Sequence, residues 1–221
     1  ASALEGVELR DIGACLLSLD GLRRWLDRHA DVAPALHAEA ASLQVDQTLL
    51  EELVYAFEND GTLSGIRFPM LSDLRERIEG SRTALRQLLG ELVSGDRFGD
   101  MLQDRFVTER NGRFVIPVKP SYARSIGIVH AASQSGETLF VEPAEVVERT
   151  NKLKELEHAL EREERRILVD LTRRVAVHVD EIEASLAVAE ALDLLVARHG
   201  LGRELRGILP DVGGGGVIRL L

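Results

Sequence analysis

Residues 110–119 have the sequence Arg-Asn-Gly-Arg-Phe-Val-Ile-Pro-Val-Lys, and this segment gives the most specific prediction of local structure in the chain. Asn-Gly between two runs of β-forming residues is the strongest short-range signal for a β-hairpin, because both residues tolerate the positive φ angles of a type I′ turn. We therefore predict a hairpin between residues 106–110 and 113–118, with its turn set by Asn111 and Gly112. Pro117 has no N–H to donate, which predicts that its strand lies at a sheet edge at that point.

A second pair of strands is predicted directly after this hairpin. Residues 126–131 and 137–142 alternate in the manner of strands, and a polar turn, Ser133-Gln134-Ser135-Gly136, separates them. Gly136 is assigned a structural role in this second turn. Residues 105–142 are thus predicted to form a small antiparallel β module.

On both sides of this module the hydrophobic period changes from two to 3.6, which is typical of amphipathic helices. Before it, Pro34 and Pro69 suit the first turns of helices, and Asp46 can cap another that ends at residues 59–61. The first helical stripe consists of Leu9, Ile12, Leu16, Leu19, Leu22 and Leu26.

After the module, residues 144–199 contain no Gly or Pro, so they predict one helix of about 80 Å at 1.5 Å per residue. The simplest topology is two long antiparallel helical arms with the β module at their shared tip. The fold class is mainly α with a small inserted antiparallel β module (α+β). The expected divisions are a helical core and first arm (1–104), the β module (105–142), the returning helix (143–200) and a Gly-rich tail (201–221).

The composition limits the classes of protein that fit. The chain has 221 residues, of which 27 are Lys or Arg and 37 are Asp or Glu, for a formal charge of −10. This balance excludes an unbroken basic surface, and 45% hydrophobic residues exclude wholesale disorder. The single cysteine, Cys15, permits no disulfide within the chain, and no signal peptide or membrane-spanning run is found. We expect a cytoplasmic protein that does not bind membranes.

Charge is distributed unevenly along the chain. Residues 105–136 hold five basic residues and one acidic residue, so this segment carries +4 and the remainder carries −14. A positive tip on a negative stalk predicts contact with a polyanion at one place. The candidate phosphate-contacting residues are Arg110, Arg113, Lys119 and Arg124. The alternative is a small sheet whose solvent face uses arginine to protect its edges.

We find no convincing active site or metal site in the sequence. There is no G-x-x-x-x-G-K-[ST] loop for phosphate, and the six histidines show no metal-ligand spacing. His130 lies close in sequence to Ser133 and Ser135, but no strained nucleophile turn accompanies them. We therefore predict no catalysis by this chain and no cofactor within it.

The β module carries a recognisable family pattern. Residues 110–119 resemble the R-N-G-R-[YF]-V-x-P-V-K segment of the bacterial MutS family, second type. Residues 127–130 and 133–143 resemble that family's G-I-V-H-D-x-S-x-S-G-x-T-L-F-[IV]-E-P segment, and residues 146–148 and 151–153 continue the match into the long helix. One departure is Ala131, which stands where the family pattern has Asp.

The resemblance implies a function that the residues alone do not give. It implies the core, lever and clamp region of an ATP-driven DNA-processing protein, whose ATPase domain, with ATP and magnesium, and whose Smr-type nuclease domain are missing here. Residues 201–221 would then lead toward that ATPase domain. The parent would be a homodimer that acts on double-stranded or branched DNA and suppresses recombination. Two alternatives remain open: a ribosome- or rRNA-binding clamp for rescue of collided ribosomes, and a purely structural coiled-coil dimerisation arm.

Overall fold

The computed structural model describes residues 3–207 and divides into two compact units. The first is built from residues before Leu63 together with residues from Leu168 onward, and the second is built from Leu63–Ile167. Residues 3–207 contain seven α-helices and one four-stranded antiparallel sheet, which confirms the predicted α+β class. The predicted Gly-rich segment of the tail, 213–216, lies outside the described residues.

The first unit is helical, and two of its helices begin where the sequence predicts. Asp46 caps α3 by accepting a hydrogen bond from the backbone N–H of Leu49 (2.7 Å), and Pro34 occupies the first turn of α2. The core lies on the predicted leucine stripe of α1, where Leu9 and Leu16 are buried and Gly13 lets the backbone approach Leu53. The helices wholly within this unit are α1 (Gly6–Arg28), α2 (Pro34–Ala40), α3 (Gln47–Ala56) and α7 (Val179–Glu204).

The prediction of one unbroken helix after the β module is wrong. The helix is interrupted at His178, which separates α6 (Val147–Val177) from α7. The backbone of His178 leaves the helical region (φ −105°, ψ 10°), and its imidazole Nδ1 lies 2.9 Å from the Glu181 carboxylate in the first turn of α7. Acidic residues are favourable at a helix N-terminus, so α7 starts anew there without a glycine or proline.

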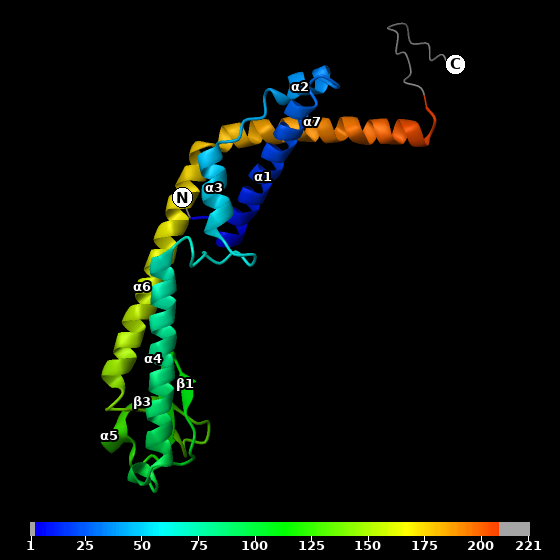
Figure 1. The fold of residues 1–221 in the computed structure, drawn as a ribbon. Coiled ribbons are helices and arrows are strands. Elements are labelled where there is room, and N and C mark those ends of the chain that lie inside the picture. The colour runs from blue at the N-terminus through cyan, green and yellow to red at the C-terminus, as the bar shows by residue number, and fades with distance from the viewer. Residues whose placement is uncertain (1–2, 208–221) are drawn as a thin grey trace. The chain divides into compact units, whose positions relative to one another are not determined.

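The second unit contains the predicted antiparallel helix pair, α4 (Pro69–Ser94) and the first part of α6 (Figure 1). Two ion pairs fix its register: Arg75 with Glu164 at 2.8 Å, and Arg82 with Glu157 at 2.6 Å. Arg82 is seven residues after Arg75 on α4, and its partner Glu157 is seven residues before Glu164 on α6, so the two helices run antiparallel. The two arms therefore pack side by side along two helical turns or more.

The β module forms a single sheet with the strand order β1-β2-β4-β3. The predicted hairpin is confirmed: Arg110 pairs with Arg113, and the turn residues Asn111 and Gly112 both have positive φ (51° and 69°). Gly136 also has positive φ (75°) in the second turn. The module comprises β1 (Thr108–Arg110), β2 (Arg113–Val118), α5 (Ala123–Ile126), β3 (Gly127–Ala132) and β4 (Leu139–Pro143), and a short 3-10 helix η1 (Asp96–Phe98) precedes it.

Pro117 lies in an interior strand, contrary to the simplest reading of its missing N–H. β2 is flanked by β1 and β4, and Pro117 pairs with Phe140 on β4. Its carbonyl accepts a hydrogen bond from the N–H of Gln103, so its ring nitrogen faces that same side, where β1 has already ended. The strand tolerates proline because this position needs no ladder donor.

One face of the sheet packs on the helix pair to form the core of the second unit. Phe114 and Ile116 of β2 lie in the same buried cluster as Leu89 of α4 and Leu153 of α6. Leu89 and Ile116 are fully buried, so both arms are attached to the sheet through close-packed aliphatic contacts. The module is a part of this unit rather than an appendage.

Candidate nucleic-acid interface on the β module

The four predicted phosphate contacts do not form one cluster. Arg110 and Arg113 flank the hairpin turn, Lys119 follows the far end of β2, and Arg124 lies on α5, whose last residue, Ile126, accepts a hydrogen bond from Ala144. Because a strand rises about 3.3 Å per residue, the six residues from Arg113 to Lys119 separate the hairpin turn from Lys119 by roughly 20 Å. The hairpin turn and Lys119 are therefore two cationic positions at opposite ends of β2, and Arg124 belongs to neither.

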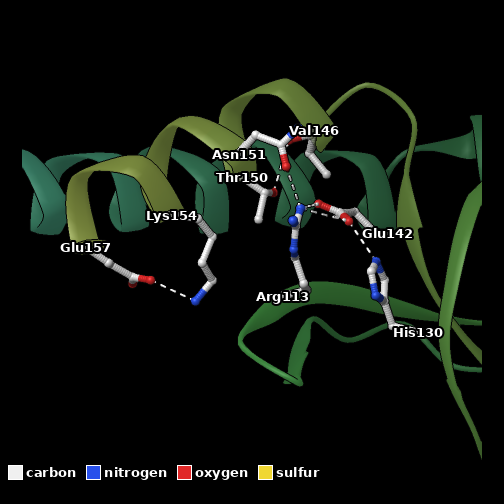
Figure 2. A network of polar contacts seen from close by, with 8 residues as sticks. All are labelled: Arg113, His130, Glu142, Val146, Thr150, Asn151, Lys154 and Glu157. Carbon is white, nitrogen blue, oxygen red and sulfur yellow. Dashed lines mark hydrogen bonds and ion pairs between the residues drawn. The ribbon is translucent and has the colours of Figure 1, made fainter. Parts of the chain in front are cut away.

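Arg113 is engaged inside the protein. One of its guanidinium nitrogens lies 3.3 and 3.4 Å from the two carboxylate oxygens of Glu142 and donates a hydrogen bond to the side chain of Asn151 on α6 (2.8 Å). Figure 2 shows these contacts, which join β2, β4 and the first turns of α6. An arginine committed to a buried carboxylate is a poor phosphate contact, so the geometry gives Arg113 a structural role in place of the predicted one.

The carboxylate of Glu142 is fully buried and is the centre of this network. Besides Arg113 it contacts the imidazole Nε2 of His130 at 2.7 Å (Figure 2). His130 is the extra residue of a β-bulge, because Val129 pairs with Val141 and Ala131 already pairs with Phe140. A buried carboxylate is tolerated only where such partners surround it, so this network holds three strands to α6.

The turn residues keep the structural role that we predict for them. The side-chain amide of Asn111 donates to the backbone carbonyl of His130 (3.4 Å), which connects the first hairpin to β3. A Cβ on Gly112 would stand 2.7 Å from the ammonium of Lys154 on α6, which is the flexible end of a side chain, so it is the positive φ of 69° that favours glycine here. The cation Lys154 is thereby brought to the hairpin from outside the predicted basic segment.

Lys154 also belongs to the ion-pair network between the two arms. Partial burial would raise the pKa of Glu157, but hydrogen bonds from Arg82 and from Lys154 outweigh it and lower that pKa below its ordinary value. The hydrogen bond to Glu157 likewise raises the pKa of Arg82. Glu157 and Arg82 therefore stay charged at neutral pH, and their ion pair holds α4 against α6.

Arg110 is exposed and held in a fixed position by an aromatic ring. Its guanidinium lies 4.7 Å from the centroid of the Phe140 ring, and one nitrogen donates to the carbonyl of Glu109 (3.0 Å). Stacking on an aromatic ring orients the plane of the guanidinium while leaving most of its donors toward solvent. Of the two arginines that flank the hairpin turn, Arg110 is thus the one whose guanidinium is exposed and not paired with a carboxylate.

The other two predicted cations lie after the far end of β2 and on α5. Lys119 donates to the backbone carbonyl of Asp100 (2.8 Å), and Arg124 on α5 is exposed and makes no ion pair or hydrogen bond with any residue in 3–207. Once Arg113 is paired with Glu142, residues 105–142 retain four cations against two acids, Glu109 and Glu137, a surface surplus of +2. Of these four cations Arg105, Arg110 and Arg124 are exposed and Lys119 is half-buried.

The serines near His130 do not form a catalytic arrangement with it. Ser133 accepts a hydrogen bond from the backbone N–H of Thr138 (3.1 Å) and lies 3.4 Å from the hydroxyl of Ser135, while the imidazole of His130 faces Glu142. Within residues 3–207 no three His, Cys, Asp or Glu side chains gather in a way that could hold a metal ion. The helices described there include none long and apolar enough to cross a membrane.

The sequence has relatives along nearly its whole length, although no family model matches it. It is 32% identical over 213 residues to a protein named Endonuclease MutS2 from Enterococcus faecalis, a match that covers 95% of this chain and 27% of the relative. Proteins of the same name from Halalkalibacterium halodurans and Anaeromyxobacter sp. are each 34% identical, over 94% and 95% of the chain and 27% and 26% of their own lengths. The chain thus spans about a quarter of the length of these curated relatives.

Helical arms, an inserted β module and this degree of similarity define a segment of a MutS-type protein. The chain is homologous to one region of MutS2, the second type of the family. The resemblance inferred from the β module is therefore confirmed, and it extends through the helices on both sides.

Proposed function

We propose that this chain is the lever and clamp region of a MutS2-type protein and that its β module grips the backbone of double-stranded or branched DNA. The observation that carries the proposal is the presentation of Arg110 at the end of β1, of Lys119 directly after β2 and of Arg124 on α5. Phosphate contacts position a protein on nucleic acid without reading its sequence, which suits isolated cations at two ends of one surface.

The spacing of these cations supports a duplex in preference to a small phosphorylated ligand. The two cationic positions lie roughly 20 Å apart, and each strand of B-DNA places a phosphate about every 3.4 Å along the axis. One duplex can therefore reach both positions, while a single phosphate group can reach only one. Without an aromatic ladder beside the cations, stacking of single-stranded bases is a poor alternative.

The packing of the second unit supports a lever role for the arms. The α4–α6 pair is joined by two interhelical ion pairs, and the sheet is attached to both helices through buried residues such as Leu89 and Leu153. A displacement along one arm would therefore move the sheet as a body. ATP and magnesium would act in parts of the parent outside these 221 residues, since the sequence holds no phosphate loop. The nuclease chemistry in the relatives' name is assigned to those other parts as well.

The proposal is tested by fluorescence anisotropy of a labelled four-way DNA junction titrated with the whole chain. The interface variant carries Arg110→Glu and Arg124→Glu. The matched control carries Arg162→Glu and Arg165→Glu, which make the same change of charge at exposed positions of α6, about 20 Å from its start.

We expect the interface variant to lose at least tenfold in affinity and the control to lose less than threefold. Equal losses in both variants would mean that the junction responds only to net charge, and the clamp proposal would be abandoned. Ribosomes added as competitor test the alternative ligand: displacement of the junction at far lower concentrations of ribosome than of unlabelled DNA would move the proposal to rRNA.

A further inference from the structure

A small hollow lies between the arm α4 and the edge strand β1. Its volume is about 310 Å³, and the residues that line it are Arg86 of α4, Val107, Thr108 and Glu109 on β1 or just before it, and Phe114 of β2. We call this hollow the β1 pocket. Pockets for small ligands begin at about 300 Å³, so the β1 pocket has room for one flat group and not for a row of them.

The β1 pocket is separate from the proposed phosphate contact at Arg110. Glu109 pairs with Phe114 across the hairpin, and paired side chains project from the same face of a sheet. Phe114 belongs to the buried cluster that includes Leu89 of α4, so this face is the one turned toward α4. Neighbouring residues of a strand point to opposite faces, so Arg110 projects to the other face, where it stacks on Phe140. Glu109 therefore faces the pocket, and Arg110 faces away from it.

Two charged side chains of opposite sign line the β1 pocket without pairing with each other. The guanidinium of Arg86 lies 5.6 Å from the centroid of the Phe114 ring, an aromatic contact that restricts its orientation. The charge of Glu109 acts on Arg82, but Arg82 is committed to Glu157 at 2.6 Å. Within residues 3–207 neither the Arg86 nor the Glu109 side chain makes a hydrogen bond or an ion pair. Both groups are therefore open to a ligand that offers a partner to each.

The arginine favours a flat, aromatic ligand. A guanidinium that lies over an aromatic ring on one side can stack with a nucleobase on its other side, and arginine planes are common stacking partners of unpaired bases. Val107 adds an apolar wall to the pocket. A single base held in this way differs from the run of stacked single-stranded bases that the β module does not suit, because it needs only one stacking partner.

The carboxylate selects among the bases. Guanine presents two adjacent donors, N1–H and the N2 amino group, which match the two oxygens of a carboxylate. Adenine and cytosine place a ring-nitrogen acceptor beside their amino group, and thymine places carbonyl oxygens on both sides of its N–H. Each of these bases would set an acceptor against the second carboxylate oxygen, so Glu109 discriminates in favour of guanine.

We propose that the β1 pocket binds the guanine base of an unpaired nucleotide, with the base stacked on Arg86 and donating two hydrogen bonds to Glu109. The inference rests on the proposed function where the nucleotide is part of DNA. A free guanine nucleotide offers the same base, and the two sources are tested separately. On a branched substrate the pocket would hold an unpaired guanine while the cations of the β module contact the phosphates.

The DNA source is tested by fluorescence anisotropy with the whole chain and a labelled duplex that carries a short thymine flap. The middle residue of the flap is either dG or dI, whose base, hypoxanthine, has the shape of guanine but lacks the N2 amino group. We expect the dG flap to bind at least about fivefold more tightly, because one hydrogen bond to a charged group is lost with dI. A flush duplex without a flap measures the phosphate contacts alone.

Two variants and one matched control assign this preference to the pocket. Glu109→Gln replaces one acceptor by an amino group that faces a donor of guanine, so the preference for dG should fall below about twofold. Arg86→Lys keeps the charge but removes the stacking plane, so both flaps should bind at least about threefold more weakly while the flush duplex is unaffected. Glu137→Gln makes the same change of charge at an exposed position between β3 and β4 and should keep the preference.

Equal binding of the dG and dI flaps by the unmodified chain would overturn the pocket proposal, while binding of the flush duplex would still support the clamp. If no DNA binds, the clamp proposal fails, and the free nucleotides dGMP and dIMP are titrated while NMR follows the amide resonances of Thr108 and Glu109. Saturation by dGMP at concentrations about fivefold lower than by dIMP would retain the pocket as a site for a free guanine nucleotide. Equal responses to the two nucleotides, or no response, would overturn it.

Discussion

Replacement of Glu142 by alanine should selectively weaken the second unit. The carboxylate is fully buried and contacts Arg113 and His130, so its removal leaves the imidazole without this partner and the guanidinium with Asn151 alone. Removing one partner of a buried ion pair lowers the free energy of unfolding by about 3–5 kcal/mol. Both partners keep partial exposure, with 27% and 19% of their side-chain surface open to solvent, so water can compensate in part. We expect the low end of that range, about 3 kcal/mol.

Hydrogen exchange measured by mass spectrometry resolves the two units separately. Under conditions where exchange reports the opening equilibrium, about 3 kcal/mol corresponds to a rise of roughly 150-fold in the exchange rates of the slowest amides. We expect this rise in β2 and β4, while peptides from α1 and α3 change by less than a factor of two. The unfolding midpoint followed by Trp25, which lies in the first unit, should stay unchanged.

The matched control is Glu145→Ala, three residues further along the chain. Glu145 is an exposed carboxylate that pairs with Arg97 at 2.6 Å, and surface pairs contribute at most about 1 kcal/mol. Equal exchange in the two variants, or a rise spread evenly over both units, would refute the view that Glu142 holds the sheet to α6.

Three further outcomes are expected. The pKa of Glu157 is lowered in the folded chain, so below its ordinary value of 4.5 the unfolded chain binds more protons at this residue than the folded chain does. The contribution of Glu157 to the stability of the second unit should therefore be constant above that pH and be lost as the pH falls through the folded pKa. In Glu157→Gln, urea titrations from pH 7 to pH 3 should no longer show this loss of stability. Gly112→Ala should cost about 1–2 kcal/mol, because alanine is strained at positive φ and meets Lys154, whereas Asn111→Gly should change urea stability by less than half as much. Asp46→Ala should cost the first unit about 1 kcal/mol through its lost N-cap, which Trp25 fluorescence can follow, while Asp46→Asn should recover most of that loss.

Local signals predicted the elements of this fold well. The Asn111-Gly112 turn, the cap at Asp46 and the start at Pro69 each depend on backbone preferences within a few residues, and the structure has all three. The break at His178 was missed because neither glycine nor proline marks it. Its signal is weaker, an acidic first turn at residues 180–181 after a run of β-branched valines, which lowers helix propensity only slightly.

The candidate site was predicted less completely because it depends on distant pairs. Glu142 is 29 residues from Arg113 and 12 from His130, and Asn151 is 38 residues from Arg113. A count of charges along a segment treats Arg113 as free, since it cannot tell that a carboxylate six residues beyond the counted segment is buried against it. Lys154 was overlooked for the same reason, because only the folding of α6 onto the hairpin brings it near Gly112.

The central claim is that a few cations of the β module bind phosphates of a DNA duplex. The most direct measurement is the salt dependence of junction binding by the unmodified chain between about 50 and 200 mM salt. Each neutralised phosphate contributes about −0.9 to the slope of log affinity against log salt, so contacts from Arg110, Lys119 and Arg124 predict a slope of about −3. A slope near zero, or no binding at 50 mM salt, would contradict the account.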